Sequence, residues 1–317
     1  MFQRTHNSFF ARLVSAALFL FVWGAHAEFD ALTSLGQEVG ERLESRVIAV
    51  LKDHEINESS GLILSQQNPD CFWTHNDSGD LPRLFLIHRD GRTIARVKID
   101  GAMAIDWEDI TMATINGSPK LIIGDIGGNT QKREHVTLYI IPELNFPFDA
   151  KRPLAPIESS ASIEATIEVT FVGGVTNYEG LAVDANAKSI VIFEKALLGA
   201  RVYSLPFPSL SKEKLKVQAT EIGQTSVPYA CACDISKDSR SMVVTNYLVG
   251  FLFTRRTLAN GSLEEWSETL QRVPTSFPLP KLRQTEAVCF SADGKSIFLS
   301  SEHTPTPLVE LKIPVSK

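Results

Sequence analysis

The sequence predicts an all-β fold, a β-propeller of five blades with four antiparallel strands each; a six-bladed ring is the alternative. Two observations support this prediction. From Arg46 onward, short runs of Val, Ile, Leu and Phe alternate with turns rich in Asp, Asn, Gly, Pro and Ser, and no convincing stretch has a helical period. A similar strand opening also recurs at five places, which is typical of a repeat architecture. The openings begin at Ser60, Glu108, Glu179, Ala232 and Glu286.

The N-terminal segment has the pattern of a secretory signal peptide. Arg4 and Arg12 precede an apolar core, and Ala25-His26-Ala27 is a small-x-small cleavage pattern. The apolar core is shorter than the roughly 20 residues that span a bilayer, although an uncleaved anchor helix is the alternative. We therefore expect removal of residues 1–27, a periplasmic or secreted location, and no stable membrane span in the mature protein.

The first two repeats each accommodate four strands. The expected strands are 61–65, 71–76, 83–88 and 92–99 in the first repeat, and 109–115, 120–126, 136–141 and 163–171 in the second. A Pro-rich connection, 142–162, accounts for the longer step to the third repeat. The last repeat is one strand short, and residues 46–51 can supply that strand and close the ring, which hides exposed strand edges. We expect 28–45 to be a leader segment and 46–317 a single propeller domain.

Composition and motifs exclude several functional classes. The formal net charge is −6 and there is no long basic run, so the chain has no electrostatic footprint for nucleic acid. It contains no Gly-x-Ser-x-Gly elbow and no His-Glu-x-x-His motif, so serine-hydrolase and zincin mechanisms lack support. The four cysteines are compatible with one or two disulfides in an exported protein, and equally with buried thiols. They are Cys71, Cys231, Cys233 and Cys289.

Acidic residues recur at matching positions of the repeats, which points to the central axis. In a propeller the first strand of every blade lines the channel, so the openings form one polar ring, and the ends of the second strands return to a similar level. Carboxylates that converge without a cation repel one another and have raised pKa values, and a hard divalent cation removes that cost. The candidate ligands are Glu108, Glu179 and Glu286 from the openings, and Asp125, Glu194, Asn76 and Asn246 from the second strands.

These oxygen ligands predict Ca²⁺, with Mg²⁺ or Mn²⁺ as alternatives. A spare carboxylate, Asp77 or Glu302, is the candidate general base. The stretch 74–80, which contains Asp77, can equally be an Asx-rich turn. The alternative to a metal is that the acids accept hydrogen bonds from backbone N–H groups of neighbouring blades, or that Lys195 neutralises the ring.

Four motifs resemble those of a group of exported bacterial β-propeller proteins. They are ESSGL at 58–62, THNDSG at 74–79, DWEDI at 106–110 and GDIGGN at 124–129. More distantly, the chain is similar to calcium-dependent propeller hydrolases, namely phytase-like proteins and gluconolactonases of the regucalcin type. This resemblance implies an axial cation that polarises the substrate. Its ligands would be Glu, Asn and Asp at positions that match Glu108, Asp125, Glu179 and Asn246.

Together these features predict an exported propeller with an axial divalent cation, acting as a metal-dependent hydrolase on a small phosphoester anion or a lactone. The second hypothesis is a non-catalytic propeller whose rim loops bind a protein or glycan while the ion is structural. A monomer is the expected state.

Overall fold

The computed structural model describes residues 40–128, 133–147, 155–208, 210 and 214–313. The expected signal peptide and most of the expected leader therefore lie outside the described residues. From Glu41 onward the described residues belong to one compact unit. Within these ranges, no helix has both the length and the apolar composition needed to cross a membrane.

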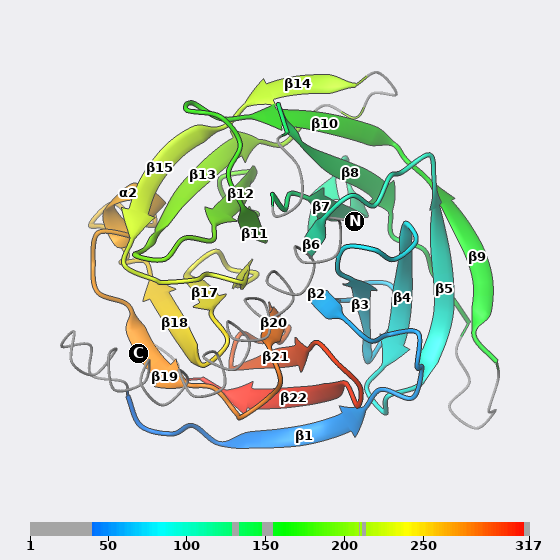
Figure 1. Cartoon of the computed structure of the whole chain (residues 1–317). Helices are drawn as coiled ribbons and strands as arrows, with labels where there is room; N and C mark the ends of the chain where they lie inside the picture. Colours follow the sequence, from blue (N-terminus) through cyan, green and yellow to red (C-terminus); the bar gives the residue numbers. More distant parts are fainter. Residues whose placement is uncertain (1–39, 129–132, 148–154, 209, 211–213, 314–317) are drawn as a thin grey trace, which may run out of the picture. The chain divides into compact units, whose positions relative to one another are not determined.

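Five antiparallel meanders are arranged as blades around a central axis (Figure 1), so the predicted five-bladed propeller is confirmed. Blade 1 contains β2 (Ser59–Leu64), β3 (Cys71–Asn76), β4 (Arg83–His88) and β5 (Thr93–Asp100). Blade 2 contains β6 (Trp107–Ile115), β7 (Ser118–Asp125), β8 (Val136–Pro142) and β10 (Ala165–Thr170). Blade 3 contains β11 (Tyr178–Asp184), β12 (Ser189–Glu194), β13 (Ala200–Pro206) and β15 (Thr220–Thr225).

The last two blades complete the ring. Blade 4 contains β16 (Ala232–Ile235), β17 (Ser241–Thr245), β18 (Val249–Thr254) and β19 (Thr275–Pro278), with the short helix α2 (Trp266–Thr269) between its last two strands. Blade 5 contains β20 (Thr285–Phe290), β21 (Ser296–Ser301), β22 (Pro307–Lys312) and, from the start of the described chain, β1 (Ser45–Val50). In each blade the first strand is innermost, and all five innermost strands begin at the same end of the axis.

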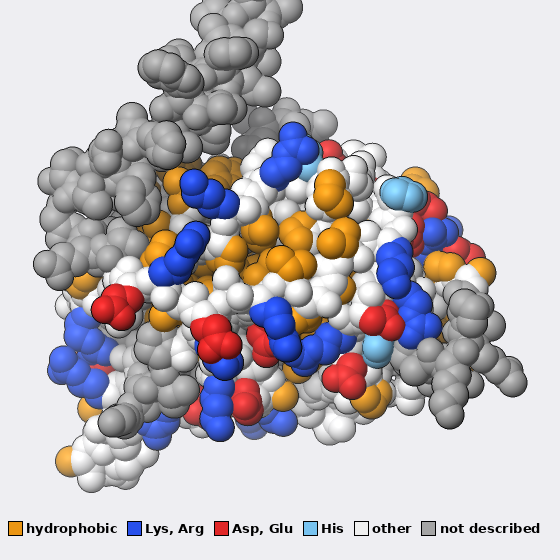
Figure 2. All heavy atoms as spheres, turned by 90° about the horizontal axis from the view of Figure 1, so that it is seen from below, with side chains coloured by type: hydrophobic (Ala, Val, Ile, Leu, Met, Phe, Trp, Pro, Cys, Tyr) orange, Lys and Arg blue, Asp and Glu red, His pale blue; other side chains and the backbone are white. Residues whose placement is uncertain are grey.

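Strand β1 closes the ring by antiparallel pairing with β22, in a register that places Val47 opposite Val309, as predicted. Figure 2 looks onto this side of the molecule, where hydrophobic side chains gather at the centre and charged side chains surround them. Val47 remains 59% exposed on the outer strand. Arg46 and Arg89 both pair with Glu310 at 2.8 Å. Such charges on an exposed edge disfavour pairing with another chain.

Two outer strands depart from the prediction. The connection 142–162 is not only a loop, because it contains β9 (Ile157–Ser162), which pairs in parallel with β5 of blade 1. Similarly, β14 (Leu215–Gln218) precedes the outer strand of blade 3 but pairs in parallel with β10 of blade 2. Each of these strands ties one blade to the outside of its neighbour.

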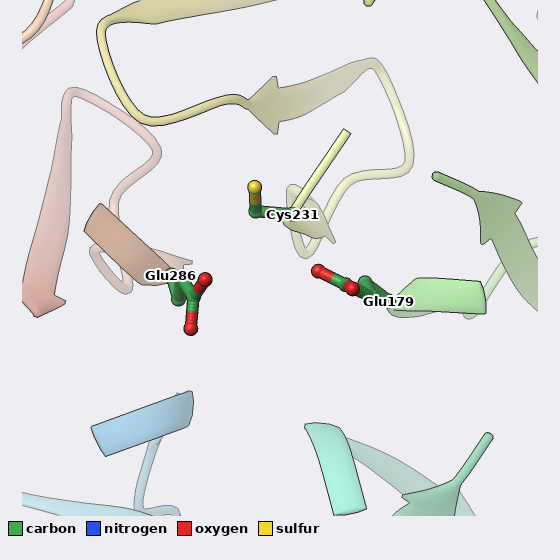
Figure 3. A group of neighbouring side chains, drawn as sticks. All are labelled: Glu179, Cys231 and Glu286. Atoms are coloured by element: carbon green, nitrogen blue, oxygen red, sulfur yellow. The ribbon is translucent and has the colours of Figure 1, made fainter. Parts of the chain in front are cut away.

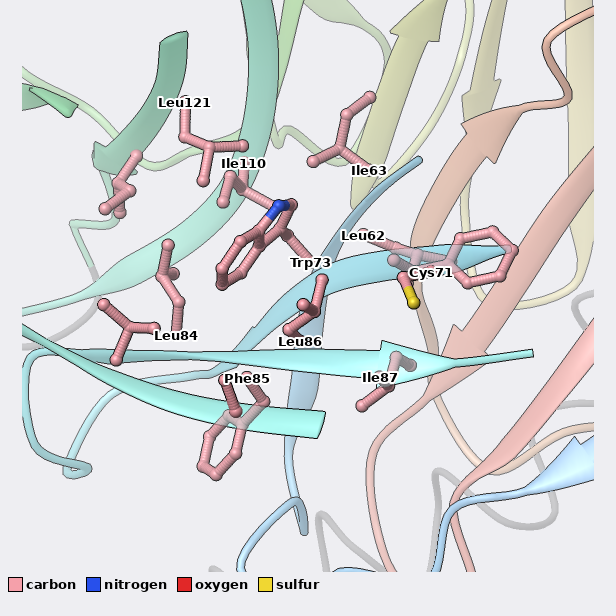
Figure 4. Packing of buried hydrophobic residues seen from close by; sticks show 14 of the residues in the cluster. Leu62, Ile63, Cys71, Trp73, Leu84, Phe85, Leu86, Ile87, Ile110 and Leu121 are labelled. Carbon is pink, nitrogen blue, oxygen red and sulfur yellow. The ribbon is translucent and has the colours of Figure 1, made fainter. Parts of the chain in front are cut away.

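The hydrophobic core lies between the blades. One cluster joins blades 5, 1 and 2, a second joins blades 2 and 3, and a third joins blades 4 and 5. Figure 4 shows the first cluster, where Trp73 lies among aliphatic side chains such as Leu86 and Ile110. Strands buried on both faces explain why the apolar runs are nearly continuous in sequence.

Candidate metal centre

A repeated β-bulge points one side chain per blade at the acidic end of the axis. In blades 1, 2, 3 and 5 the pairing between first and second strand shifts by one residue close to the start of the first strand. A bulge adds one residue to one strand of a pair and redirects its side chain. The additional residues are Ser60, Glu108, Glu179 and Glu286.

In blade 4 the sequence predicts that Ala232 is the residue that faces the axis, but Ala232 lies one position C-terminal to the equivalent of Glu179 and Glu286. Ala232 pairs with Thr245 in the way that Gly180 pairs with Phe193 and Ala287 with Ser300. The residue before Ala232 therefore occupies the ring position, and that residue is Cys231. Figure 3 shows the Glu179 and Glu286 side chains extending towards each other with Cys231 beside them, and one potential ligand atom of each residue lies within 4.8 Å of the others.

Seven side chains form three overlapping groups at this end of the axis, which we call the acidic cluster. Within each group, one potential ligand atom per residue lies within 4.8 Å of the others. Asp77 and Glu286 each belong to two groups, so the three groups are continuous. The groups are Glu179–Cys231–Glu286, Asp77–Glu286–Glu302, and Asp77–Asp106–Glu108. The structure thus brings together the three first-choice ligands and both candidate bases.

The remaining four candidate ligands have other partners. The buried Asp125 carboxylate pairs with Arg133 at 2.8 Å and accepts the N–H of Asp106 at 3.2 Å. Glu194 is held by two hydrogen bonds from Arg201, of 2.8 and 2.6 Å. Both carboxylates are therefore neutralised by an arginine within their own blade.

The two asparagines cap backbone turns. The side-chain oxygen of Asn76 accepts the N–H groups of Asn57 and Glu58, both at 3.2 Å. The side-chain oxygen of Asn246 accepts the N–H groups of Leu248 and Val249, at 3.0 and 2.8 Å. Each side-chain oxygen is thus occupied by the backbone of a neighbouring loop.

In blades 1, 3 and 5 the residue that follows the second strand, rather than the last residue of that strand, reaches the acidic cluster. This position is Asp77 in blade 1 and Glu302 in blade 5. In blade 3 it is Lys195, whose ammonium bonds to Glu179 at 2.5 Å and to the Tyr247 hydroxyl at 2.9 Å. In blade 4 Tyr247, two residues after β17, reaches this level and also bonds to Glu286. A polar residue just after a second strand is the signal that could have identified Tyr247.

Burial and mutual repulsion raise the pKa values of four carboxylates in the acidic cluster. Burial is the main cause in each case, and neighbouring carboxylates add to it. The pKa of Asp77 is raised to about 7, that of Glu286 to about 8, and that of Glu108 well above its usual range. The pKa of Glu179 reaches only about 7, because Lys195 partly offsets its burial. Among the described residues these four carboxylates share one bonded lysine, so their raised pKa values favour bound protons or a cation at neutral pH.

One buried oxygen in the acidic cluster has no partner. Glu108 is 3% exposed, and its Oε1 atom makes no hydrogen bond with any described residue. Gly127 lies directly against Glu108 and Asp106, and a Cβ at that position would overlap both carboxyl groups. The glycine therefore leaves room around the unpartnered oxygen. A carboxylate oxygen buried without a donor fits a cation, because an unpaired buried charge is otherwise strongly disfavoured.

The axis is blocked just beyond the acidic cluster. The fully buried Asp109 carboxylate accepts the N–H groups of Ile110 and Leu181, both at 2.8 Å, and that of Cys233 at 3.4 Å. Asp234 similarly accepts the N–H of Phe290 in the next blade at 2.8 Å. One alternative to a metal is that the ring carboxylates accept hydrogen bonds from backbone N–H groups of neighbouring blades. Asp109 and Asp234 make such bonds, but they are not the residues for which this is expected.

All four cysteines are buried free thiols, so the structure contains none of the disulfides considered from the sequence. His75 lies in the core with its ring against Trp107, and burial lowers its pKa to about 4.

No protein-family profile matches the chain, and no curated protein matches it. Among solved structures, the chain is similar to the WD40 domain of Neurospora crassa Pan2. The two share 9% identity and a TM-score of 0.43, over 88% of this chain and 99% of that domain. The β-propeller assignment rests on the strand order described above.

Proposed function

We propose that the acidic cluster binds a divalent cation, Ca²⁺ in preference to Mg²⁺ or Mn²⁺, and that the protein is an exported metal-dependent hydrolase of phosphoesters or lactones. The observation that carries the cation site is the buried, unpartnered Oε1 of Glu108 among six carboxylates. Removing water from several carboxylates is tolerated when they are paired or coordinate a metal. The oxygen-only group of Asp77, Asp106 and Glu108 suits a hard cation best.

The cation would supply Lewis-acid polarisation of the substrate. The remaining residues have roles of their own. Glu286 and Glu302 hydrogen-bond to each other and so share a proton, and Glu302, which also accepts a hydrogen bond from the Gln284 side chain at 2.7 Å, would serve as the general base. The Lys195 ammonium and the Tyr247 hydroxyl, 2.9 Å apart, provide donors for an anionic group or a leaving oxygen.

A binding propeller with a structural ion is the second candidate, and exposed apolar residues favour it. Leu198 is 91% exposed, Val172 73% and Leu81 66%. These residues and Met103, Leu197 and Tyr229 lie on loops at the end of the axis where the innermost strands begin, the same end as the acidic cluster. Exposed apolar groups around a recessed site are typical of surfaces that bind a partner, here a protein or glycan.

Thermal unfolding with chelator, and then with Ca²⁺ or Mg²⁺ restored, tests the cation. A ligand at a hundredfold excess over Kd stabilises the folded state by about 2.7 kcal/mol. We expect a Ca²⁺-dependent rise that Glu108→Gln removes and that Glu221→Gln, an exposed carboxylate on an outer strand, retains. Absence of any shift, together with no metal by elemental analysis, would overturn the cation site.

Turnover separates the two functions. If the protein is a hydrolase, Ca²⁺-dependent hydrolysis of a phosphomonoester or lactone is lost in Glu108→Gln while the folded structure persists. If the ion is structural, the same variant loses stability and no hydrolysis is found in the parent protein. N-terminal sequencing of protein recovered from the periplasm or medium tests the predicted export and cleavage after Ala27.

A further inference from the structure

A cavity lies at the end of the propeller axis opposite to the acidic cluster, and the proposed hydrolase does not use it. Its volume is about 630 Å³, within the range of sites that hold small organic ligands. All five blades contribute the distal part of their innermost strands to its lining. The apolar part of the wall contains Ile63, Met112, Val183, Phe207, Ile235 and Phe290, and polar side chains such as Gln66 and Thr111 line the rest. We call this cavity the apolar funnel.

The apolar funnel is separated from the acidic cluster. Asp109 crosses the axis between them and bonds to the backbone of blades 3 and 4. Gly180 packs against Cys233 at the same level, where a Cβ would approach the sulfur to 3.0 Å. A ligand in the apolar funnel therefore does not reach the acidic cluster along the axis.

The lining of the apolar funnel includes two lysines, Lys188 and Lys237, both exposed. Neither side chain has a hydrogen bond or ion pair with another described residue. The carboxylate in the wall, Asp234, is occupied by the backbone N–H groups of Ile235 and Phe290, both at 2.8 Å. The lining thus carries two lysine side chains and one carboxylate, and the carboxylate is hydrogen-bonded to the backbone rather than to either lysine.

Two more carboxylates lie on the turns beside the lining. Asp238 accepts the Ser236 hydroxyl at 2.6 Å, and Asp293 accepts the Ser291 hydroxyl at 2.7 Å. Both are committed to stabilising their own turns, and neither pairs with Lys188 or Lys237 in the described structure. Both ammonium groups are therefore available to an anionic ligand.

We propose that the apolar funnel binds a small amphipathic anion, with its apolar body between the five strands and its anionic group at Lys188 and Lys237. Burial of an alkyl chain against the apolar part of the wall provides the affinity, because it removes apolar surface from water. The lysines fix the orientation, since an ammonium attracts a carboxylate and a phosphate alike.

Isothermal titration of the full-length protein tests this site, with laurate, lauryl phosphate and dodecanol as probes below their aggregation limits. We expect saturable 1:1 binding of at least one anion, and binding of dodecanol at least about tenfold weaker, a difference of about 1.4 kcal/mol. A preference between the two anions identifies the natural head group as carboxylate or phosphate. Saturable binding of neither anion, or equal binding of dodecanol, would overturn the proposal.

Variants at exposed positions locate the site without disturbing the core. Ala185→Trp fills the mouth of the apolar funnel and is expected to abolish binding, whereas Ala187→Trp, exposed two residues away and outside the lining, is expected to retain it. The double variant Lys188→Glu/Lys237→Glu should weaken anion binding at least about tenfold. Unchanged affinity in Ala185→Trp would place the ligand elsewhere and refute the site.

Discussion

Without a cation in the acidic cluster, the folded protein should become less stable as the pH rises, which is the opposite of the usual effect of paired carboxylates. In the cation-free protein the pKa of Glu286 is about 8 instead of 4.5, and that of Asp77 about 7 instead of 3.8. A group whose pKa is higher in the folded state holds its proton more tightly there. Its stabilising contribution is complete below the unfolded pKa, and it is lost as the pH rises through the folded pKa. The cation-free protein should therefore lose stability from about pH 5 to about pH 8.

The magnitude follows from linkage. For Glu286, which is 5% exposed, the interval between 4.5 and about 8 corresponds to at most about 5 kcal/mol at 1.36 kcal/mol per pH unit. Because Glu286 and Glu302 share a proton, the contributions do not add, and a net loss of about 2 kcal/mol is expected. In a propeller of this size that corresponds to a fall in Tm of about 4–8 °C.

The assay is thermal unfolding with chelator and with excess Ca²⁺, at about pH 5 and about pH 8. Cation binding needs ionised carboxylates, so the stabilisation by Ca²⁺ should be small at the lower pH and largest at the higher pH. The variant Asp77→Asn should flatten the pH dependence of the cation-free protein, because it removes one of the repelling charges. A cation-free Tm that stays constant or rises over this interval would refute the reasoning.

Four further predictions concern individual parts of the fold and site. Gly127→Ala should abolish Ca²⁺-induced stabilisation, because the new methyl group would overlap the Glu108 carboxyl group; retained stabilisation would mean that the cation binds elsewhere. Arg133→Ala should cost roughly 3 kcal/mol in urea unfolding, since it leaves the fully buried Asp125 carboxylate without its partner, and Arg133→Lys should recover part of the loss. Starting the chain at Leu51 removes β1 and exposes the edge of β22; we expect a loss of about 3 kcal/mol from the broken hydrogen bonds, with aggregation on heating, and an unchanged Tm would contradict the role of β1 in closure. The four buried thiols should react with a thiol reagent only after denaturation; rapid reaction of the native protein would contradict their burial.

Much of the fold follows from local signals in the sequence. Alternating or continuous apolar runs, bounded by turn residues, place the four strands of each of the first two blades within a few residues. Ring closure by β1 also follows, because the last repeat lacks one strand and an apolar run is available before the first repeat. The parallel strands β9 and β14 do not follow, since a short polar edge strand has no pattern that distinguishes it from a loop.

The acidic cluster was predictable in part. Glu108, Glu179 and Glu286 occupy equivalent positions in the repeats, so their convergence follows from symmetry alone. Whether the carboxylates at the ends of the second strands, Asp125 and Glu194, also lie in the acidic cluster depends on which basic side chains pair with them in the folded chain. Asp125 forms an ion pair with Arg133, which lies beyond the end of β7. In blades 1, 3 and 5 the residue after the second strand, and not the last residue of that strand, reaches the acidic cluster.

The sequence by itself determined the fold class, favoured five blades over six, and placed the acidic residues at one side of the ring, because short apolar runs and the spacing of the repeats are local signals. The tertiary structure decided which side chains meet. In four blades a bulge sets the facing residue just before the regular ladder, and in blade 4, where the ladder has no bulge, Cys231 and not Ala232 lies close to Glu179 and Glu286. The structure also decided that the axis is divided into an acidic cluster and an apolar funnel, because that division depends on hydrogen bonds from Asp109 to two other blades.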